Sequence, residues 1–345
     1  MSRIIMSRGS SNWAVPAAKP CKAIAPLWAA EFRNWTHLPD IPCGCVVKME
    51  AKVISLPETA FLDSAAIPRD DDVYQVWAVC YGSGQNQRVH DNFIRRDMHD
   101  GPMPLDYFLW VVRNANRTIL VDTGMRPEAS VQRGRPIAFD PVEGLERIGI
   151  AADSISDIVI THLHWDHAGN IHRFANARLH LQETEIAFAT GRCMCDALHR
   201  YPFDVEDVVT VVRKTYADRV TFHCGDGDFL PGTSLHIFPG HSPGVQGVRV
   251  NTVRGPILLA SDAAHYFANV LHRKPFIVTV DTRDTLASYT KLMKVAGGMD
   301  RLVPGHDPKI RRYYPACIVN GVELIALHET PDPIDLAELG RFDDF

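Results

Sequence analysis

Residues 161–170 read THLHWDHAGN and directly follow a short apolar run, DIVI, at 157–160. Within six positions this segment carries four side chains that can bind metal: His162, His164, Asp166 and His167. On an extended segment residues i and i+2 share one side, so the first two histidines can point together at one ion. The turn that follows places the aspartate and the third histidine toward a second ion. Imidazole and carboxylate together suit zinc, and also iron or manganese, so the segment predicts a metal site at the end of a buried strand.

The rest of the chain supplies two groups of predicted strands, with helices between and after them. Apolar, β-branched and aromatic runs bounded by turn residues predict strands at 73–81, 105–113, 118–121, 157–161, 178–181, 220–223, 234–238, 246–252, 256–260 and 302–303. Apolar residues at helical spacing predict helices at 183–189, 205–217 and 285–295. Strand-rich halves with segregated helices indicate packed sheets covered by helices, which is an α+β fold class.

Four further motifs occur in a fixed order around the histidine segment. They are ILVDTG at 119–124 with Asp122, FPGHSPG at 238–244 with His241, LLASDA at 258–263 with Asp262, and VPGHDP at 303–308 with His306. Together with His-x-His-x-Asp-His, they resemble the signature of the metallo-β-lactamase superfamily over residues 73–315. The resemblance implies a four-layer αβ/βα sandwich with the metal ions at one edge, between two sheets.

The resemblance also implies how the ligands divide between two divalent metal ions. The first ion would be held by His162, His164 and His241, the second by Asp166, His167 and His306, and both by a bridging Asp262. Asp122 would bind neither ion and would organise the loops beneath the site, or it is a plain turn residue after a strand. Zinc is the expected metal, with iron, manganese or cobalt as alternatives.

Two close divalent ions would give these residues a hydrolytic chemistry. They lower the pKa of a shared water, and the metal-bridging hydroxide that results would attack a carbonyl or phosphoryl centre. Asp166 would pass a proton to the leaving group. The sequence has no P-loop lysine and no Gly-x-Gly-x-x-Gly after a strand, so neither motif offers a rival to this chemistry. The prediction is therefore a metal-dependent hydrolase that acts on ester bonds.

The identity of the bridging residue narrows the class of hydrolase. β-Lactamases of this superfamily usually lack a bridging aspartate, whereas Asp262 favours lactonases, thioesterases and phosphodiesterases. The segment MPLDYFLWVVRNANRTILVDTGM at 103–125 resembles the N-terminal hairpin of the quorum-quenching N-acyl homoserine lactonases. The first hypothesis is therefore a lactone-opening hydrolase with a small-molecule lactone or ester as its substrate. The alternatives are a thioesterase or a phosphotriesterase/phosphodiesterase of the same fold, and a non-catalytic metal-binding module.

One position departs from the lactonase pattern. Those enzymes often have a tyrosine three residues after the bridging aspartate, where it meets the substrate carbonyl. Here that position is His265, and the tyrosine is Tyr266, one residue later. His265 would substitute as the hydrogen-bond donor to the oxyanion. Both residues are therefore candidate catalytic residues beside Asp166, unless they simply pack near the site.

Composition and charge limit the classes of protein and partner that are possible. The 345 residues are 46% hydrophobic and carry a formal net charge of −5, which excludes a wholly disordered chain and disfavours a nucleic-acid partner. No apolar run is long enough to span a membrane, so a membrane partner is not expected. Because no secretory signal is visible, the cytoplasm is the expected location, with reduced thiols.

The chain divides into three predicted parts. Residues 1–72 are rich in proline and lack a regular period, so they predict a partly ordered N-terminal extension. Residues 73–315 form the predicted hydrolase domain, and residues 316–345 form a C-terminal tail that packs on that domain. A homodimer formed through the tryptophans of the extension is a further hypothesis.

Overall fold

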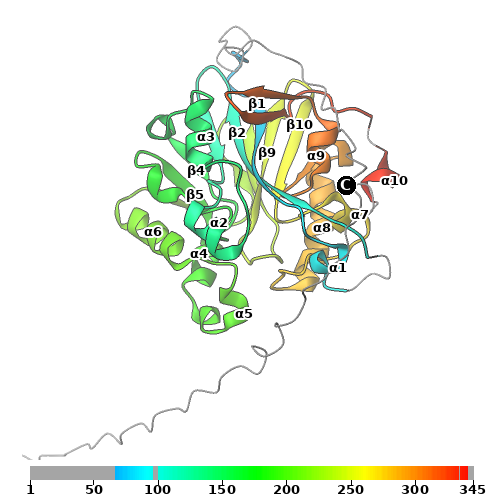
Figure 1. The fold of residues 1–345 in the computed structure, drawn as a ribbon. Coiled ribbons are helices and arrows are strands. Elements are labelled where there is room, and N and C mark those ends of the chain that lie inside the picture. The colour runs from blue at the N-terminus through cyan, green and yellow to red at the C-terminus, as the bar shows by residue number, and fades with distance from the viewer. Residues whose placement is uncertain (1–66, 96–99, 334, 341–345) are drawn as a thin grey trace, which may run out of the picture. The chain divides into compact units, whose positions relative to one another are not determined.

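The computed structural model of this chain describes residues 67–95, 100–333 and 335–340. These residues form two β-sheets packed face to face, with helices on the outer face of each sheet (Figure 1). The predicted α+β four-layer sandwich is therefore confirmed. Most of the predicted N-terminal extension lies outside the described residues.

The larger sheet has eight strands among the described residues, in the order β12-β13-β1-β2-β3-β4-β5-β6. Neighbouring strands from β12 to β3 pair antiparallel, and those from β3 to β6 pair parallel. The strands are β1 (Gln75–Gly84), β2 (Leu105–Arg113), β3 (Thr118–Val121), β4 (Asp157–Val159), β5 (Arg178–Gln182), β6 (Val220–His223), β12 (Ala316–Val319) and β13 (Val322–Ala326).

The smaller sheet has five strands among the described residues, in the order β11-β10-β9-β8-β7. These are β7 (Gly227–Asp228), β8 (Thr233–Ile237), β9 (Gln246–Thr252), β10 (Gly255–Ser261) and β11 (Leu302–Pro304). The pair β10–β11 is parallel, so both sheets are mixed. The carboxyl ends of β10 and β11 consequently lie at the same edge.

Helices cover the two outer faces of the sandwich (Figure 1). The described α-helices are α1 (Val89–Asn92), α2 (Pro127–Arg133), α3 (Pro141–Arg147), α4 (Glu183–Ala189), α5 (Ala197–Arg200), α6 (Val205–Tyr216), α7 (Phe267–Leu271), α8 (Thr282–Ala296), α9 (Lys309–Tyr313) and α10 (Leu336–Leu339). Short 3-10 turns lie at Ala152–Ser154, Ile171–Arg173, Arg192–Cys195 and Met299–Arg301. None of these helices has the length and apolar character needed to cross a membrane.

Two apolar clusters hold the layers together. One lies between the larger sheet and helices including α3 and α6; the other fills the space between the sheets and continues beneath α8 and α9. Strand β2 serves both clusters because successive side chains point to opposite faces: Leu109 joins the first cluster and Trp110 the second. A strand covered on both faces is apolar throughout, and this explains why the run at 105–113 lacks polar alternation.

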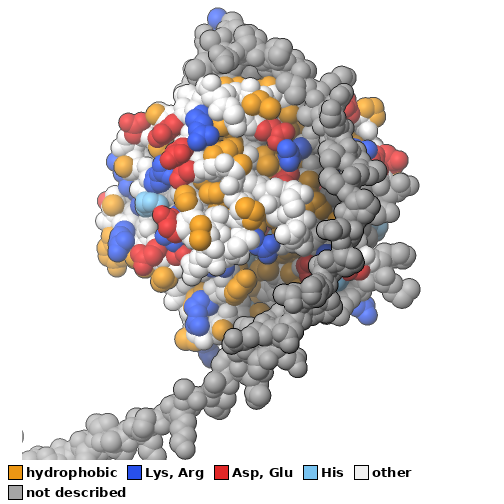
Figure 2. Space-filling model, in the orientation of Figure 1, with side chains coloured by type: hydrophobic (Ala, Val, Ile, Leu, Met, Phe, Trp, Pro, Cys, Tyr) orange, Lys and Arg blue, Asp and Glu red, His pale blue; other side chains and the backbone are white. Residues whose placement is uncertain are grey.

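The predicted strands and helices agree closely with the structure, with differences mainly at their ends. Strands β12 and β13 were not predicted from the sequence; they form a hairpin that pairs with β1 through β13. The larger sheet thus continues beyond residue 315, although the division of the chain into domains stays a prediction. On the face shown in Figure 2, acidic and basic side chains are interspersed.

Candidate metal centre

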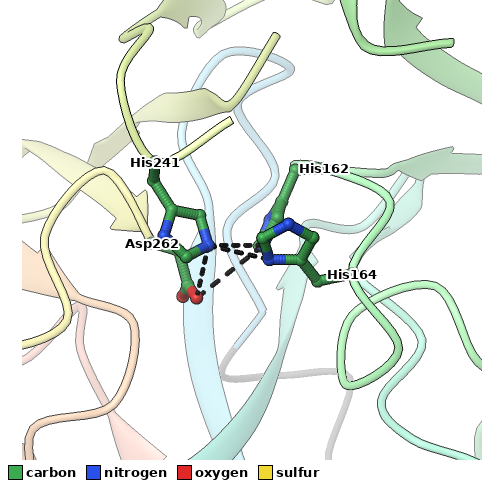
Figure 3. Close-up of side chains that lie close together, drawn as sticks. All are labelled: His162, His164, His241 and Asp262. Atoms are coloured by element: carbon green, nitrogen blue, oxygen red, sulfur yellow. Dashed lines mark hydrogen bonds and ion pairs between the residues drawn. The ribbon is translucent and has the colours of Figure 1, made fainter. Parts of the chain in front are cut away.

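All seven predicted ligand side chains meet at one edge of the sandwich, in loops that follow strands. The segment with His162 follows β4, His241 follows β8, Asp262 follows β10 and His306 follows β11. Their elements are far apart in the sequence, but the carboxyl ends of these strands share one edge. Figure 3 shows His162, His164, His241 and Asp262 pointing toward one another.

Three imidazoles converge in the first group of ligands. His241 Nε2 lies 3.2 Å from His162 Nε2 and 2.8 Å from His164 Nδ1. Asp262 Oδ2 lies 3.4 Å from His241 Nε2 and 3.7 Å from His162 Nε2. Three ring nitrogens and one carboxylate oxygen around a small space form the donor set that suits a tetrahedral zinc ion.

A second group of ligands lies beside the first and shares Asp262. Asp166, His167 and His306 present ligand atoms within 4.8 Å of one another. Asp262 Oδ1 lies 3.0 Å from His306 Nε2 and 3.3 Å from His167 Nε2. Since Oδ2 faces the first group and Oδ1 the second, Asp262 has the orientation that a bridging carboxylate requires.

The protonation of the first group fits a bound cation. Burial lowers the pKa of His162 and His164 well below the usual value and that of His241 to about 3. These rings are therefore neutral near pH 7, and only a neutral imidazole can bind a metal. Asp262 Oδ1 and His167 Nε2 are buried without a hydrogen-bond partner among the described residues. Buried polar atoms of this kind are costly unless a ligand satisfies them, so the site fits two divalent ions.

The second group carries positive charge opposite its carboxylates. Burial opposes ionisation of Asp262, yet the imidazoles of His265 and His306 hold the pKa of this carboxyl well below its usual range. Burial also opposes protonation of His167, but Asp262 and Asp166 hold its pKa well above the usual value. A divalent cation would compensate the same carboxylates that protonated imidazoles compensate here.

Hydrogen bonds orient the ligand rings from behind. His167 Nδ1 donates to Asp122 Oδ2 at 2.8 Å, His241 Nδ1 to the Val278 carbonyl at 2.6 Å, and His306 Nδ1 to the Asp106 carbonyl at 2.7 Å. Each bond uses Nδ1, so that Nε2 is the nitrogen that faces the ligand cluster and would bind a metal. Such bonds fix the ring orientation and raise the basicity of the ligand.

Asp122 lies beneath the centre and ties two loops together. Its carboxylate accepts hydrogen bonds from the Thr161 amide at 2.7 Å and the Thr161 hydroxyl at 2.8 Å, besides that from His167. Its backbone has φ 61°, a left-handed conformation that costs energy for a residue other than glycine. Two hypotheses were open for Asp122, and this geometry favours the one in which it organises the loops beneath the site over that of a plain turn residue.

Glycines precede two of the histidines because the chain passes close to other groups there. A Cβ at Gly240, where φ is 142°, would lie 2.3 Å from the Thr285 hydroxyl oxygen. A Cβ at Gly305 would lie 2.5 Å from Asp262 Oδ1. The Gly-His spacing in both motifs therefore reflects close packing around the centre.

Glu185 also organises the centre, although the sequence did not indicate it. It lies in the first turn of α4, is fully buried, and accepts hydrogen bonds from the Leu163 amide, the Ser242 hydroxyl and the Gly244 amide. This carboxylate joins the His162–His167 loop to the loop carrying His241. The segment GHSPG also has the spacing of a serine nucleophile motif, but the hydroxyl of Ser242 is occupied by Glu185.

The two other candidate catalytic residues occupy different surroundings. His265 lies in the ligand cluster: its Nε2 is 3.0 Å from Asp262 Oδ2, and its ring stacks on Phe276 at 3.5 Å. Tyr266 is fully buried, and its hydroxyl donates to the Pro104 carbonyl at 3.2 Å. The structure thus brings His265, but not the Tyr266 hydroxyl, into contact with the predicted ligands.

Residues 190–204 lie against the metal-binding loop and are fastened to it. The Phe203 ring packs edge-on against His164, with centroids 4.8 Å apart, and the Trp165 amide donates to the Pro202 carbonyl. Arg126 forms ion pairs with Asp204 at 2.6 Å and with Asp207 at 3.2 Å. This arginine therefore connects the loop after β3 with the start of α6.

Asp207 makes the stability of this connection depend on pH. Burial raises its pKa to about 7, although Arg126 lies beside it. Because the folded pKa exceeds that of an exposed aspartate, about 3.9, the folded protein holds the proton more tightly. The resulting stabilisation is complete below about pH 4 and is lost as the pH rises through about 7. We expect the free energy of unfolding to fall by a few kcal/mol over this range, since one pKa unit corresponds to about 1.4 kcal/mol.

Denaturant unfolding of Asp207→Asn at several pH values measures this contribution. The variant should show a flatter dependence than the wild type between pH 5 and pH 8. Glu206→Gln, which changes the exposed neighbour on the same helix, serves as the control and should follow the wild type. Identical slopes for Asp207→Asn and the wild type would contradict the assignment.

The chain is similar to known proteins in sequence. A family model described as the metallo-beta-lactamase superfamily matches residues 104–306. An N-acyl homoserine lactonase of Bacillus thuringiensis is 30% identical over 220 residues, which cover 59% of this chain and 82% of that protein. N-acyl homoserine lactonase AiiB of Agrobacterium fabrum is 31% identical over 176 residues, which cover 46% of this chain and 63% of that protein.

The fold is also similar to that of solved lactonase structures. The crystal structure of a quorum-quenching N-acyl homoserine lactone lactonase superposes with a TM-score of 0.59 and 25% sequence identity, covering 70% of this chain and 95% of that one. The resemblance predicted from the motifs is thus confirmed, and the similarity to the lactonases is distant.

Proposed function

This chain belongs to the metallo-beta-lactamase superfamily, and we propose that within it the protein is a dinuclear metal-dependent hydrolase that opens lactone rings. Asp262 is the observation that carries the proposal, because its two oxygens face two separate groups of buried ligands. That arrangement supports a pair of divalent ions, with zinc as the first choice and iron, manganese or cobalt as alternatives. The family and the geometry together support a hydrolase of this superfamily with a His/Asp metal-site cluster.

Lactone opening needs a nucleophilic water, a proton donor for the leaving oxygen and a donor to the oxyanion. Divalent ions held by the His/Asp cluster would lower the pKa of a bound water and polarise the carbonyl oxygen. The water oxygen joins the acyl carbon, the ring C–O bond breaks, and the leaving alkoxide takes a proton. Asp166 is suited to deliver this proton, because its side chain is 12% exposed while that of Asp262 is only 3% exposed. His265 is the candidate donor to the oxyanion, since it lies within the ligand cluster.

The substrate class that we propose comes from the relatives of this chain. The proteins that are 30% and 31% identical to this chain are N-acyl homoserine lactonases, so we propose N-acyl homoserine lactones as substrates and quorum quenching as the consequence. The cytoplasmic location and the homodimer stay predictions. A small neutral substrate fits the modest net charge of the chain.

Turnover of a substrate panel tests this proposal. The purified protein, loaded with zinc, is offered N-acyl homoserine lactones of varied acyl length, simple γ-lactones, thioesters and phosphotriesters. We expect kcat/KM for N-acyl homoserine lactones to exceed that for the other classes by at least about tenfold, a difference of about 1.4 kcal/mol in transition-state binding. A preference for thioesters or phosphotriesters would reject lactone opening and leave hydrolysis in place. Full metal occupancy without turnover of any ester would instead indicate a binding module.

A further inference from the structure

We propose that Tyr107 is a catalytic residue whose hydroxyl donates a hydrogen bond to the substrate oxygen that gains negative charge during hydrolysis. The inference rests on the proposed hydrolase function and adds a residue outside the predicted site. Ester hydrolysis builds negative charge on the former carbonyl oxygen, and a fixed donor at that place accelerates the reaction.

Tyr107 belongs to β2, the strand that also orients the last ligand. The carbonyl of the preceding residue, Asp106, accepts the hydrogen bond from His306 Nδ1, and the His306 carbonyl accepts from the Asp106 amide at 2.9 Å. The Tyr107 ring packs edge-on against the His306 ring, with centroids 5.5 Å apart and an interplanar angle of 82°. It also packs against Trp165, inside the histidine segment, at 6.1 Å. The strand therefore holds this tyrosine directly beside the ligand cluster.

The hydroxyl of Tyr107 has no hydrogen-bond partner among the described residues, although the residue is only 2% exposed. A tyrosine in so buried a position usually places its hydroxyl against a hydrogen-bond partner. Two neighbouring tyrosines follow the rule: the Tyr81 hydroxyl donates to the Asp166 carbonyl at 2.8 Å, and the Tyr266 hydroxyl donates to the Pro104 carbonyl. Of these three phenols, Tyr107 alone keeps its donor available for a ligand.

The charges around Tyr107 keep its hydroxyl protonated. Burial raises its pKa above the usual value, and the carboxylates of Asp166 and Asp262 act in the same direction, against Arg135. A phenol that stays neutral throughout the working pH range can donate a hydrogen bond without first having to gain a proton.

His265 does not make this role redundant. Its Nε2 contacts Asp262 Oδ2 at 3.0 Å, and its ring is held between Phe276 and His306, whose centroid lies 5.2 Å away. An imidazole engaged with a ligand carboxylate must give up that contact before Nε2 can serve a substrate. Tyr107 gives up no partner on binding, so its donor is already prepared for the developing charge.

Kinetics of Tyr107→Phe test the inference, because this change removes the hydroxyl and keeps the ring that packs on His306. We expect kcat to fall about 10²-fold with KM changed less than about threefold, which is typical for the loss of one oxyanion donor. Metal content per chain and the melting temperature should equal those of the wild type. Tyr74→Phe is the matched control: it removes a buried hydroxyl that bonds the Pro231 carbonyl on the opposite side of the fold, and its kcat should not change.

The comparison uses the best substrate of the panel, so that the two proposals can fail separately. A wild type that prefers thioesters or phosphotriesters rejects lactone opening and still allows the test of Tyr107. Unchanged kcat in Tyr107→Phe would overturn the inference, as would a loss explained by lower metal content. A 10²-fold loss in Tyr266→Phe without one in Tyr107→Phe would assign the donor to the other tyrosine and overturn it as well.

Discussion

Asp262→Asn is expected to reduce hydrolysis by on the order of 10³-fold or more. The amide has one oxygen and one NH₂ group, so it cannot present an anionic oxygen to both groups of ligands, as the carboxylate does at 3.4 Å from His241 and 3.0 Å from His306. Charge stabilisation by bound metal is worth several kcal/mol in such reactions, and each 1.36 kcal/mol corresponds to a factor of ten in rate. Steady-state kinetics together with elemental analysis measure the effect.

Metal content distinguishes loss of the shared carboxylate from unfolding of the variant as the cause of lost activity. The variant should hold fewer than two ions per chain and keep the circular dichroism spectrum of the wild type. Asp157→Asn is the matched control, because Asp157 pairs with His180 at 3.0 Å, away from the ligand cluster, and its loss should leave kcat unchanged. Retention of two ions and more than a tenth of the activity by Asp262→Asn would refute the bridging geometry.

Removal of metal by a chelator is expected to abolish hydrolysis, and zinc, manganese or cobalt should restore it. Ring nitrogens of His162 and His164 lie 3.2 Å and 2.8 Å from His241 Nε2, and metal ions held in this cluster would supply both the nucleophilic water and the Lewis acid. Dialysis against a chelator, followed by activity assays after each added metal, measures the loss and the recovery.

The same experiment has a readout that does not depend on catalysis. A ligand that binds only the folded state stabilises it by about 2.7 kcal/mol at a hundred times its dissociation constant, so the metal-free protein should melt several degrees lower. Addition of magnesium, which prefers oxygen ligands, should restore neither stability nor activity. Activity that survives complete removal of metal would exclude the dinuclear proposal.

The sequence predicted the parts of the centre that depend on local spacing. Three histidines and an aspartate after a buried strand predict a site, because an extended segment points His162 and His164 to one side and the turn that follows brings the other two side chains beside them. The more distant ligands could be found only through motifs in a known order, since no local rule places His241 or His306 near residue 162. Their glycine neighbours became interpretable only once Gly305 was seen to approach the bridging carboxylate.

The residues that escaped prediction act through contacts between distant elements. Glu185 reads as an ordinary acidic residue in the first turn of a helix, where exposure is the rule, yet it is fully buried and joins two ligand loops. Tyr107 lies within an apolar run where an aromatic residue looks like core. Which face of β2 lies beside the ligand edge depends on the packing of the whole sheet, and a single sequence does not contain this information.

The hydrogen bond between His306 and the Asp106 carbonyl spans 200 positions of the chain. Closing so long a loop is slow because conformational entropy is lost before the contact contributes any stability, and proteins rich in such contacts fold slowly. The second group of ligands is therefore complete only after the strand that follows α8 has docked beside β10. We therefore expect tight uptake of the second ion to depend on the docking of β11 beside β10, which brings His306 to the other ligands.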